Sequence, residues 1–445
     1  MSDSSSQEFT FQSLHRPLSY RAIDFLGSRL GSMGISIADI NVDSLLERAR
    51  KITHLNDFGD SSFEGPLSEL VDSLNSEADL NFMGKYMMRE MLSELLCERL
   101  RVQHYFKRFP EVSEEKIEKP LFITGLPRSG TRFLFNLLCQ DPNSQWLKHW
   151  ELHLPSQEFV DREEFDRAAE EKLLIKKSSA DLKGFKSLVP NIDKCYIFGV
   201  TAPEECFRFL ARSFVCSVFP VYAEVPSYFE QMKSEWWGGG ADTQKLAEVY
   251  QYYRQQIQLV KHRRNLPQTP NVKIESQRHW VFKSPSHLMS LHAISEVFTD
   301  ACLVHIHRDP LYGIPSNWSL LAMIRAAFSD RIDRQSMGRQ LLQDFSYSIN
   351  RALEIRRNNP SLNIIDISYD RFIANPVQVI RKIYQKFDYT FTEEVEMGIK
   401  NYILEDPHEK DGKHIYSLEQ FGIEKEEVYD AFSEYYDYLN SINTD

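Results

Sequence analysis

From residue 120 onward, short apolar runs alternate with longer amphipathic stretches. The runs lie at 121–123, 280–282, 302–306 and 364–367, and apolar residues recur at helical spacing over 288–298, 313–328, 337–357 and 377–387. Short buried strands separated by long helices are typical of a parallel sheet whose two faces are covered by helices. The pattern therefore predicts a layered α/β fold with a central parallel sheet.

Two other parts of the chain show helical periodicity without such strands. Apolar stripes at helical spacing run through residues 1–118, so we predict a helical N-terminal region there and an α/β domain over 119–445. A helical insertion is expected within that domain at about 155–265. The chain is therefore predicted to have a helical part that packs on an α/β core.

Within the insertion, the sequence predicts particular elements. A charged, amphipathic helix is expected over 161–178. A second helix is expected from Thr201, whose hydroxyl, early proline and following acids suit a helix start, to about Phe219. A turn is expected over 236–240, where two tryptophans precede three glycines.

A glycine loop follows the first predicted strand. Gly125 ends the strand, Leu-Pro-Arg-Ser-Gly-Thr-Arg occupies 126–132, and apolar residues at helical spacing come next. A loop placed between a strand and a helix directs free backbone N–H groups at one point, where the helix dipole adds partial positive charge. The segment therefore predicts a binding site for a phosphate-like anion.

The spacing of Gly125 and Gly130 matches the nucleotide-binding loop G-x-x-x-x-G-K-[ST], but the next two residues differ from it. Thr131 stands in place of the lysine, Arg132 stands in place of the Mg²⁺-binding hydroxyl, and Arg128 supplies a cation inside the loop. An anion held by a guanidinium and backbone N–H groups, without a metal, suits this loop. A phosphotransferase with a degenerate loop is the alternative.

The motif Gly-x-Pro-Arg-Ser-Gly-Thr after a strand resembles the 5′-phosphosulfate loop of the sulfotransferases, which use 3′-phosphoadenosine 5′-phosphosulfate (PAPS). Arg132 departs from the usual Thr-Thr ending. The resemblance is to the bacterial-type enzymes and covers nearly the whole chain, including Pro-Glu-Glu-Cys at 203–206. The phosphosulfate-binding residues that it implies are Pro127, Arg128, Ser129, Gly130, Thr131 and Arg132.

This resemblance implies a P-loop-like three-layer fold and a sulfotransferase activity. A sulfuryl group would pass from PAPS, the co-substrate, to a hydroxyl of a small-molecule acceptor and leave adenosine 3′,5′-bisphosphate, with no metal. Residues 1–118 would line the acceptor pocket. A non-catalytic binder of adenosine bisphosphate is a further alternative.

Other candidate donor-binding residues follow the later strands. Arg308 and Ser316 resemble the 3′-phosphate motif of the family, Tyr369 resembles the tyrosine near the adenosine, and Lys283 resembles the strand-end lysine that contacts the sulfate or its bridging oxygen. Ligands bind at the carboxyl ends of parallel strands, so these residues are expected to lie near Arg128. Taken singly, each has a structural alternative, such as an Arg308–Asp309 ion pair or a tyrosine in the core.

An acceptor hydroxyl needs a base that takes its proton. Glu151 lies downstream of the loop helix, near the position where related enzymes have a catalytic glutamate, and is the first candidate. His149, His153 and His287 are the alternatives. Arg128 and Lys283 complete the predicted catalytic set, and His414, Tyr416 and Gly422 are expected to close over the 3′-phosphate or adenosine.

Composition narrows the function classes. The net charge of −12 argues against general nucleic-acid binding, so the cations of an anion site must form a local cluster. No apolar run is long enough to span a bilayer, no secretory signal is visible, and six scattered cysteines suit a reducing compartment. We therefore expect a cytoplasmic enzyme whose partner is a small molecule. The sequence leaves the oligomeric state open, a homo-oligomer included.

Overall fold

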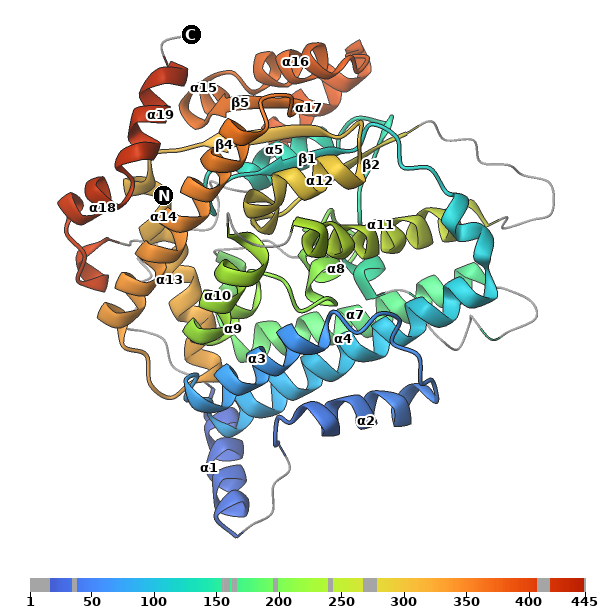
Figure 1. Ribbon diagram of the computed structural model, residues 1–445, viewed down its shortest axis with the longest axis vertical. Helices are drawn as coiled ribbons and strands as arrows, with labels where there is room; N and C mark the ends of the chain where they lie inside the picture. Colours follow the sequence, from blue (N-terminus) through green and yellow to red (C-terminus); the bar gives the residue numbers. More distant parts are fainter. Residues whose placement is uncertain are drawn as a thin grey trace, which may run out of the picture.

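The computed structural model describes residues 17–33, 38–153, 155, 161, 166–194, 199–238, 243–266, 278–405 and 417–443. Among these residues, five parallel strands form one sheet in the order β2-β3-β1-β4-β5, which crosses the upper half of the molecule in Figure 1. The strands are β1 (Leu121–Thr124), β2 (Ser144–Gln145), β3 (His279–Lys283), β4 (Cys302–His307) and β5 (Ile364–Ser368). The predicted α/β fold with a parallel sheet is confirmed, and β2 was missed because it is only a two-residue edge strand.

Alternate residues of β1, the central strand, pack on opposite faces of the sheet. Leu121 and Ile123 lie in one buried apolar cluster, whereas Phe122 lies in another. The first cluster includes α5 (Thr131–Leu138), α16 (Pro376–Phe387) and α17 (Glu393–Glu405), and the second includes α11 (Thr243–Asn265), α12 (Leu291–Val297), α13 (Pro310–Phe328) and α14 (Arg334–Asn358). Because both faces are covered, every residue of β1 and β4 is buried, as is typical of a parallel sheet.

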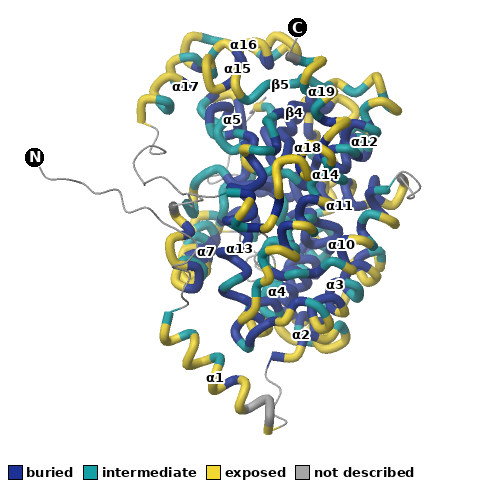
Figure 2. Tube along the Cα trace, turned by 90° about the vertical axis from the view of Figure 1, so that its left-hand side faces the viewer, coloured by how far each residue is buried: buried dark blue, intermediate teal, exposed yellow. Residues whose placement is uncertain are grey.

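A helical region lies below the sheet in the view of Figure 1. It consists of α1 (Leu18–Ser32), α2 (Val42–Thr53), α3 (Glu64–Ser76), α4 (Phe82–Arg108), α7 (Arg167–Leu188), α8 (Phe207–Ala211), α9 (Phe219–Tyr222) and α10 (Pro226–Met232). Figure 2 shows that α4 is largely buried and that α1 is mostly exposed. Buried residues of α2–α4 belong to the same cluster as those of α8–α14. The predicted boundary at residue 118 stays a prediction.

The remaining helices follow β5. They are α15 (Tyr369–Ala374), α18 (Lys425–Ala431) and α19 (Ser433–Asn443), together with the α16 and α17 already described. The last of them, α19, lies close to β5 and α14, so that the C-terminal part of the chain returns to the sheet.

Three predictions within the insertion are corrected by the structure. The charged helix begins at Arg167, where Asp166 caps it, and extends to Leu188. The segment from Thr201 is not helical until Phe207, because its backbone groups pair with neighbouring segments instead. In the predicted turn, Trp236 and Trp237 instead end the helical segment Lys233–Trp237, and Gly238 follows in an extended conformation, whereas residues 239 and 240 lie outside the described residues.

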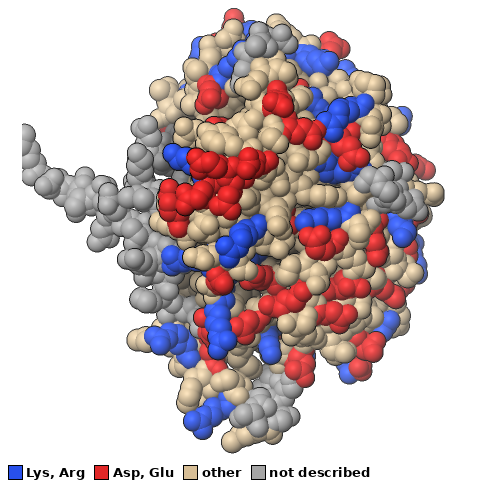
Figure 3. All heavy atoms as spheres, turned by 60° about the vertical axis from the view of Figure 1, so that its left-hand side comes forward, with Lys and Arg blue, Asp and Glu red and all other residues tan. Residues whose placement is uncertain are grey.

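The surface carries interspersed charges. On the face shown in Figure 3, acidic side chains gather in one patch and basic side chains are scattered among other acidic ones. None of the described helices combines the length and the apolar character needed to cross a lipid bilayer. The cytoplasmic location stays a prediction.

Candidate functional site

The loop between β1 and α5 depends on its glycines. Gly125 has φ +153° and Gly130 has φ +87°, a region in which L side chains are strained. A Cβ added to Gly125 would lie 2.5 Å from the carbonyl oxygen of Ile306, and one added to Gly130 would lie 2.9 Å from the ring of Tyr369. The backbone of the loop therefore lies directly against β4 and against the start of α15.

The substitution Gly130→Ala is expected to lower the free energy of unfolding by about 1–2 kcal/mol, because alanine would be strained at positive φ and would contact Tyr369. Urea unfolding measures this difference. Gly65→Ala and Gly184→Ala are matched controls in helices, where an added Cβ meets no atom within 4 Å. Equal destabilisation in all three variants would contradict the prediction.

The structure brings together four of the predicted donor-binding residues. Nε of Arg128 donates a hydrogen bond to Oγ of Ser316 over 3.1 Å, and Nη1 of Arg308 donates one to the carbonyl oxygen of Arg128 over 2.6 Å. The Arg308 guanidinium lies 4.1 Å from the centroid of the Tyr369 ring. Arg128, Arg308, Ser316 and Tyr369 thus form one cationic cluster beyond the carboxyl ends of β1, β4 and β5.

Ser129 lies in the same loop, and the hydrogen-bonding state of its hydroxyl indicates whether an anion fits there. Its Oγ is buried and has no hydrogen-bond partner among the described residues. A buried hydroxyl without a partner costs about 1–3 kcal/mol. An orphaned donor in the loop that also carries Arg128 fits a ligand with negatively charged oxygens.

A buried ion pair stands at the end of the neighbouring strand β3. The ammonium of Lys283 contacts a carboxylate oxygen of Glu205, and only 4% of Lys283 is exposed. Burial lowers the pKa of Lys283, although the Glu205 carboxylate acts in the opposite direction. β3 pairs directly with β1, so this cation lies beside the strand that leads into the glycine loop.

The first turn of α5 is joined to a second glutamate. Nη1 of Arg132 lies 2.8 Å from Oε1 of Glu204, and Nδ1 of His149 lies 3.3 Å from Oε2 of the same carboxylate. The side chain of His149, in the short helix His149–His153, is 19% exposed. A carboxylate on Nδ1 leaves Nε2 of the imidazole as the nitrogen that can accept a proton.

Glu204 and Glu205 were missed as functional residues because the sequence predicted a helix start there. The segment 200–206 instead pairs on two sides: the N–H groups of His149 and Trp150 donate to the carbonyls of Ala202 and Val200, and the N–H of Cys206 donates to Lys283. Two adjacent acids within an apolar segment were the available signal. Their side chains diverge, one toward Arg132 and the other toward Lys283.

The first candidate base, Glu151, is held elsewhere. Its two carboxylate oxygens accept hydrogen bonds from Nε and Nη2 of Arg264 over 2.9 and 2.6 Å, and one also accepts the N–H of Lys148. The side chain is 3% exposed. These contacts favour a structural ion pair for Glu151, and its role as a base stays an untested prediction that the geometry does not favour.

Of the other two histidines, His287 is buried and the side chain of His153 is 10% exposed. His287 lies between the hydroxyl of Tyr250 and the thiol of Cys206, at 2.8 and 3.1 Å, and burial lowers its pKa to about 3. Burial also lowers the pKa of His153 to about 4, and its Nδ1 lies 3.4 Å from Glu98. Both are weak bases with little access to a ligand, so His149 is the histidine whose geometry suits proton transfer.

Two residues of the predicted set, His414 and Tyr416, lie outside the described residues. Gly422 has φ +64° and ends the short helix Glu419–Phe421. Its expected position over the ligand stays a prediction.

Residues 120–393 match the sequence profile of the sulfotransferase family. The chain is a member of the sulfotransferase family. The solved structure of sulfotransferase STF1 from Mycobacterium tuberculosis H37Rv has a TM-score of 0.73 to this sulfotransferase at 26% identity, and the match covers 90% of this chain and 100% of that one. Sulfotransferase STF9 from Mycobacterium avium has a TM-score of 0.73 at 23% identity, covering 90% of this chain and 97% of the other. Among curated proteins, no sequence matches this chain.

The resemblance to bacterial-type sulfotransferases that was seen in the sequence is thus confirmed. The family profile begins just before β1 and includes the glycine loop, Glu204, Glu205, Lys283, Arg308 and Tyr369. Every group of the cationic cluster and of the two glutamate pairs therefore lies within the part of this sulfotransferase that matches the family profile.

Proposed function

We propose that this sulfotransferase uses PAPS as its donor and transfers the sulfuryl group to a hydroxyl of a small-molecule acceptor. The observation that carries the proposal is the direct contact of Arg308 with the carbonyl of Arg128, whose guanidinium in turn contacts Ser316. The orphaned hydroxyl of Ser129 lies in the same loop. Two guanidinium groups in one cluster suit a donor with separate anionic groups.

In this proposal, Arg128 and the N–H groups of the glycine loop bind the 5′-phosphosulfate, with Thr131 at the start of α5 as a further donor. Arg308 and Ser316 bind the 3′-phosphate, and the Tyr369 ring, which lies under the Arg308 guanidinium, borders the adenosine. Sulfuryl transfer is expected to follow the physics of phosphoryl transfer, in which positioning and charge stabilisation dominate.

Lys283 and His149 have the proposed chemical roles. As the bond from sulfur to the acceptor oxygen forms, the bond from sulfur to the bridging oxygen breaks, and Lys283 stabilises the negative charge that stays on the 5′-phosphate. Nε2 of His149 takes the proton of the acceptor hydroxyl, and Glu204 stabilises the imidazolium through Nδ1. Glu205 holds Lys283 in place before the donor binds.

The decisive experiment measures donor binding and transfer separately. Adenosine 3′,5′-bisphosphate is expected to stabilise the protein against thermal unfolding, whereas ATP with Mg²⁺ is expected to do so far less. PAPS labelled in its sulfate is then offered with a panel of phenols, alcohols and sugars. Magnesium-dependent ATP turnover would overturn the proposal in favour of a phosphotransferase. Tight bisphosphate binding without transfer to any acceptor would favour a non-catalytic binder.

The variant His149→Gln is expected to lower kcat/KM about 100- to 1,000-fold at neutral pH, because general base catalysis typically contributes factors of this order. Glu204→Gln should also lower kcat/KM, but by less, because the imidazole stays in place while its imidazolium loses the carboxylate that stabilises it. Initial rates with labelled PAPS measure both variants.

Glu151→Gln separates the two candidate bases. If Glu151 pairs only with Arg264, the variant should be less stable than the wild type and should keep most of its kcat/KM. A large loss of kcat/KM in Glu151→Gln, with nearly wild-type kcat/KM in His149→Gln, would return the role of base to Glu151.

A further inference from the structure

The C-terminal helix α19 contacts the residue before Arg308. The hydroxyl of Tyr435, a residue that is 1% exposed, lies 3.1 Å from Nδ1 of His307, and Nε2 of His307 lies 2.7 Å from Oδ1 of Asp366. Burial lowers the pKa of His307, so the ring is neutral at neutral pH. A neutral ring that donates Nε2–H to the Asp366 carboxylate must accept the Tyr435 hydroxyl at Nδ1.

The next residue of α19 contacts the residue after Arg308. The hydroxyl of Tyr436 donates to Oδ1 of Asp309 over 2.7 Å, and the same oxygen accepts the N–H of Leu311 over 2.9 Å. Asp309 is the N-cap of α13, the helix that carries Ser316. Tyr436 therefore holds the segment that follows β4 and the start of α13, the helix whose Ser316 contacts Arg128.

A third tyrosine completes the connection to the sheet. The hydroxyl of Tyr438 donates to Oδ2 of Asp366 over 2.8 Å, and Arg356 from α14 donates to both oxygens of Asp366 over 2.6 and 2.7 Å. The guanidinium lies 5.2 Å from the centroid of the Tyr438 ring. Strands β4 and β5 and helices α14 and α19 are thus joined at one carboxylate.

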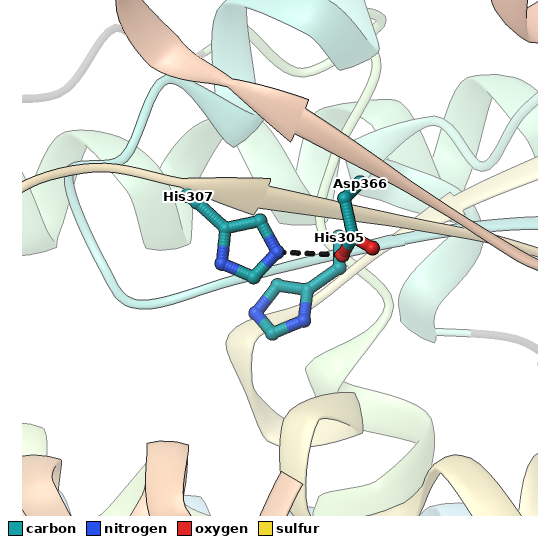
Figure 4. Close-up of side chains that lie close together, drawn as sticks. All are labelled: His305, His307 and Asp366. Carbon is teal, nitrogen blue, oxygen red and sulfur yellow. Dashed lines mark hydrogen bonds and ion pairs between the residues drawn. The ribbon is translucent and has the colours of Figure 1, made fainter. Parts of the chain in front are cut away.

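His305, His307 and Asp366 have the spacing of metal ligands, and Figure 4 shows the His307–Asp366 contact and His305 beside it. Most of the potential ligand atoms of this group already have partners, and only Nε2 of His305 has none among the described residues. Both oxygens of Asp366 bind Arg356, and both ring nitrogens of His307 have partners. A cation at this point would stand beside a guanidinium, so the group is an internal hydrogen-bond network rather than a metal site.

We propose that α19 positions the cationic cluster, because Tyr435 and Tyr436 hold the chain on either side of Arg308. This inference rests on the proposed function, because it assigns the helix to the 3′-phosphate end of the donor. The two hydroxyls act through His307 and Asp309 and touch no ligand themselves. They direct the Arg308 guanidinium and, through α13, the Ser316 hydroxyl toward one anionic group.

Tyr435→Phe and Tyr436→Phe test this proposal, because each removes one hydroxyl and keeps the aromatic ring. Each is expected to weaken the binding of adenosine 3′,5′-bisphosphate about three- to tenfold, the size expected for loss of one hydrogen bond. Binding of adenosine 5′-phosphate, which has no 3′-phosphate, should change less than twofold. In turnover, KM for PAPS should rise with kcat nearly unchanged. Isothermal titration calorimetry and initial rates measure these values.

Tyr389→Phe is the matched control, because it removes one tyrosine hydrogen bond, to the carbonyl of Lys119, at the amino-terminal end of the sheet. It should leave the ratio of the two nucleotide affinities unchanged. In the Arg308→Ala background, Tyr435→Phe should have no further effect on bisphosphate binding, since Arg308, the residue that it positions through His307, is gone.

The outcomes separate the two proposals. If wild-type protein binds adenosine 3′,5′-bisphosphate no more tightly than adenosine 5′-phosphate, the proposed donor is wrong. If the wild type discriminates between the two and the tyrosine variants keep the same ratio, α19 has no positioning role. Equal losses for both nucleotides in the tyrosine variants would show a general structural effect and would also overturn the inference.

Discussion

Lys283→Ala is expected to lower kcat about 100- to 1,000-fold, which is the usual cost of removing one preorganised group that stabilises developing charge. Lys283 is buried at the end of β3 and contacts Glu205, so its ammonium is already oriented before the donor binds. The affinity for adenosine 3′,5′-bisphosphate should fall much less, because charge on the bridging oxygen develops only during transfer. Single-turnover rates with PAPS and calorimetric binding measure the two effects.

Lys233→Ala is the matched control for this variant. Lys233 is also a largely buried lysine and lies 2.8 Å from Asp344, but it belongs to the helical segment Lys233–Trp237 rather than to a strand end of the sheet. The control should lose stability and keep its kcat. A Lys283→Ala enzyme with nearly wild-type kcat, or with kcat and bisphosphate affinity lowered equally, would remove Lys283 from the proposed role.

Glu98→Gln is expected to lower the free energy of unfolding by about 3–5 kcal/mol, the range for breaking a buried ion pair by removing one charge. Glu98 is fully buried in α4, and its oxygens lie 2.8 Å from Nη2 of Arg208 and 3.0 Å from Nε of Arg212. Glutamine keeps the shape of the side chain and leaves two guanidinium groups without their carboxylate. Urea unfolding at neutral pH measures the loss.

The destabilisation of Glu98→Gln should depend on pH in a defined direction. Burial alone would raise the pKa of Glu98, but Arg208 and Arg212 outweigh burial and hold the pKa well below its ordinary value of 4.5. A depressed pKa in the folded state stabilises the protein above the unfolded pKa, and this contribution is lost as the pH falls toward the folded pKa. The difference between wild type and variant should therefore be constant near neutral pH and shrink below about pH 4.5.

Glu396→Gln is a suitable control for that series, because Glu396 forms ion pairs with Arg381 and Lys400 at the surface. Exposed ion pairs contribute little to stability, so this variant should unfold near wild type at every pH. If Glu98→Gln were as stable as Glu396→Gln, the prediction would be wrong, because loss of the Glu98 charge beside Arg208 and Arg212 would then not change the free energy of unfolding.

The sequence by itself determined the parallel sheet, apart from β2, and the glycine loop. Glycine spacing in the loop and short apolar strands are local signals, since they reflect backbone conformation and burial on both faces. Parallel strands must present their carboxyl ends at one edge, so the proximity of Arg128 and Arg308 followed from topology before any contact was seen. Residues 120–393 carry these same signals and match the sulfotransferase family.

Only the tertiary structure decided how the acids and histidines of the predicted set are paired. Glu151 pairs with Arg264, a residue 113 positions away, and His149 pairs with Glu204, 55 positions away, and neither pairing has a periodic signal in the sequence. The tyrosines of α19 are likewise 127 and 128 positions from Asp309 and His307. Side-chain pairing across such separations depends on how helices pack on the sheet, so local pattern cannot determine which carboxylate is neutralised and which histidine stays accessible.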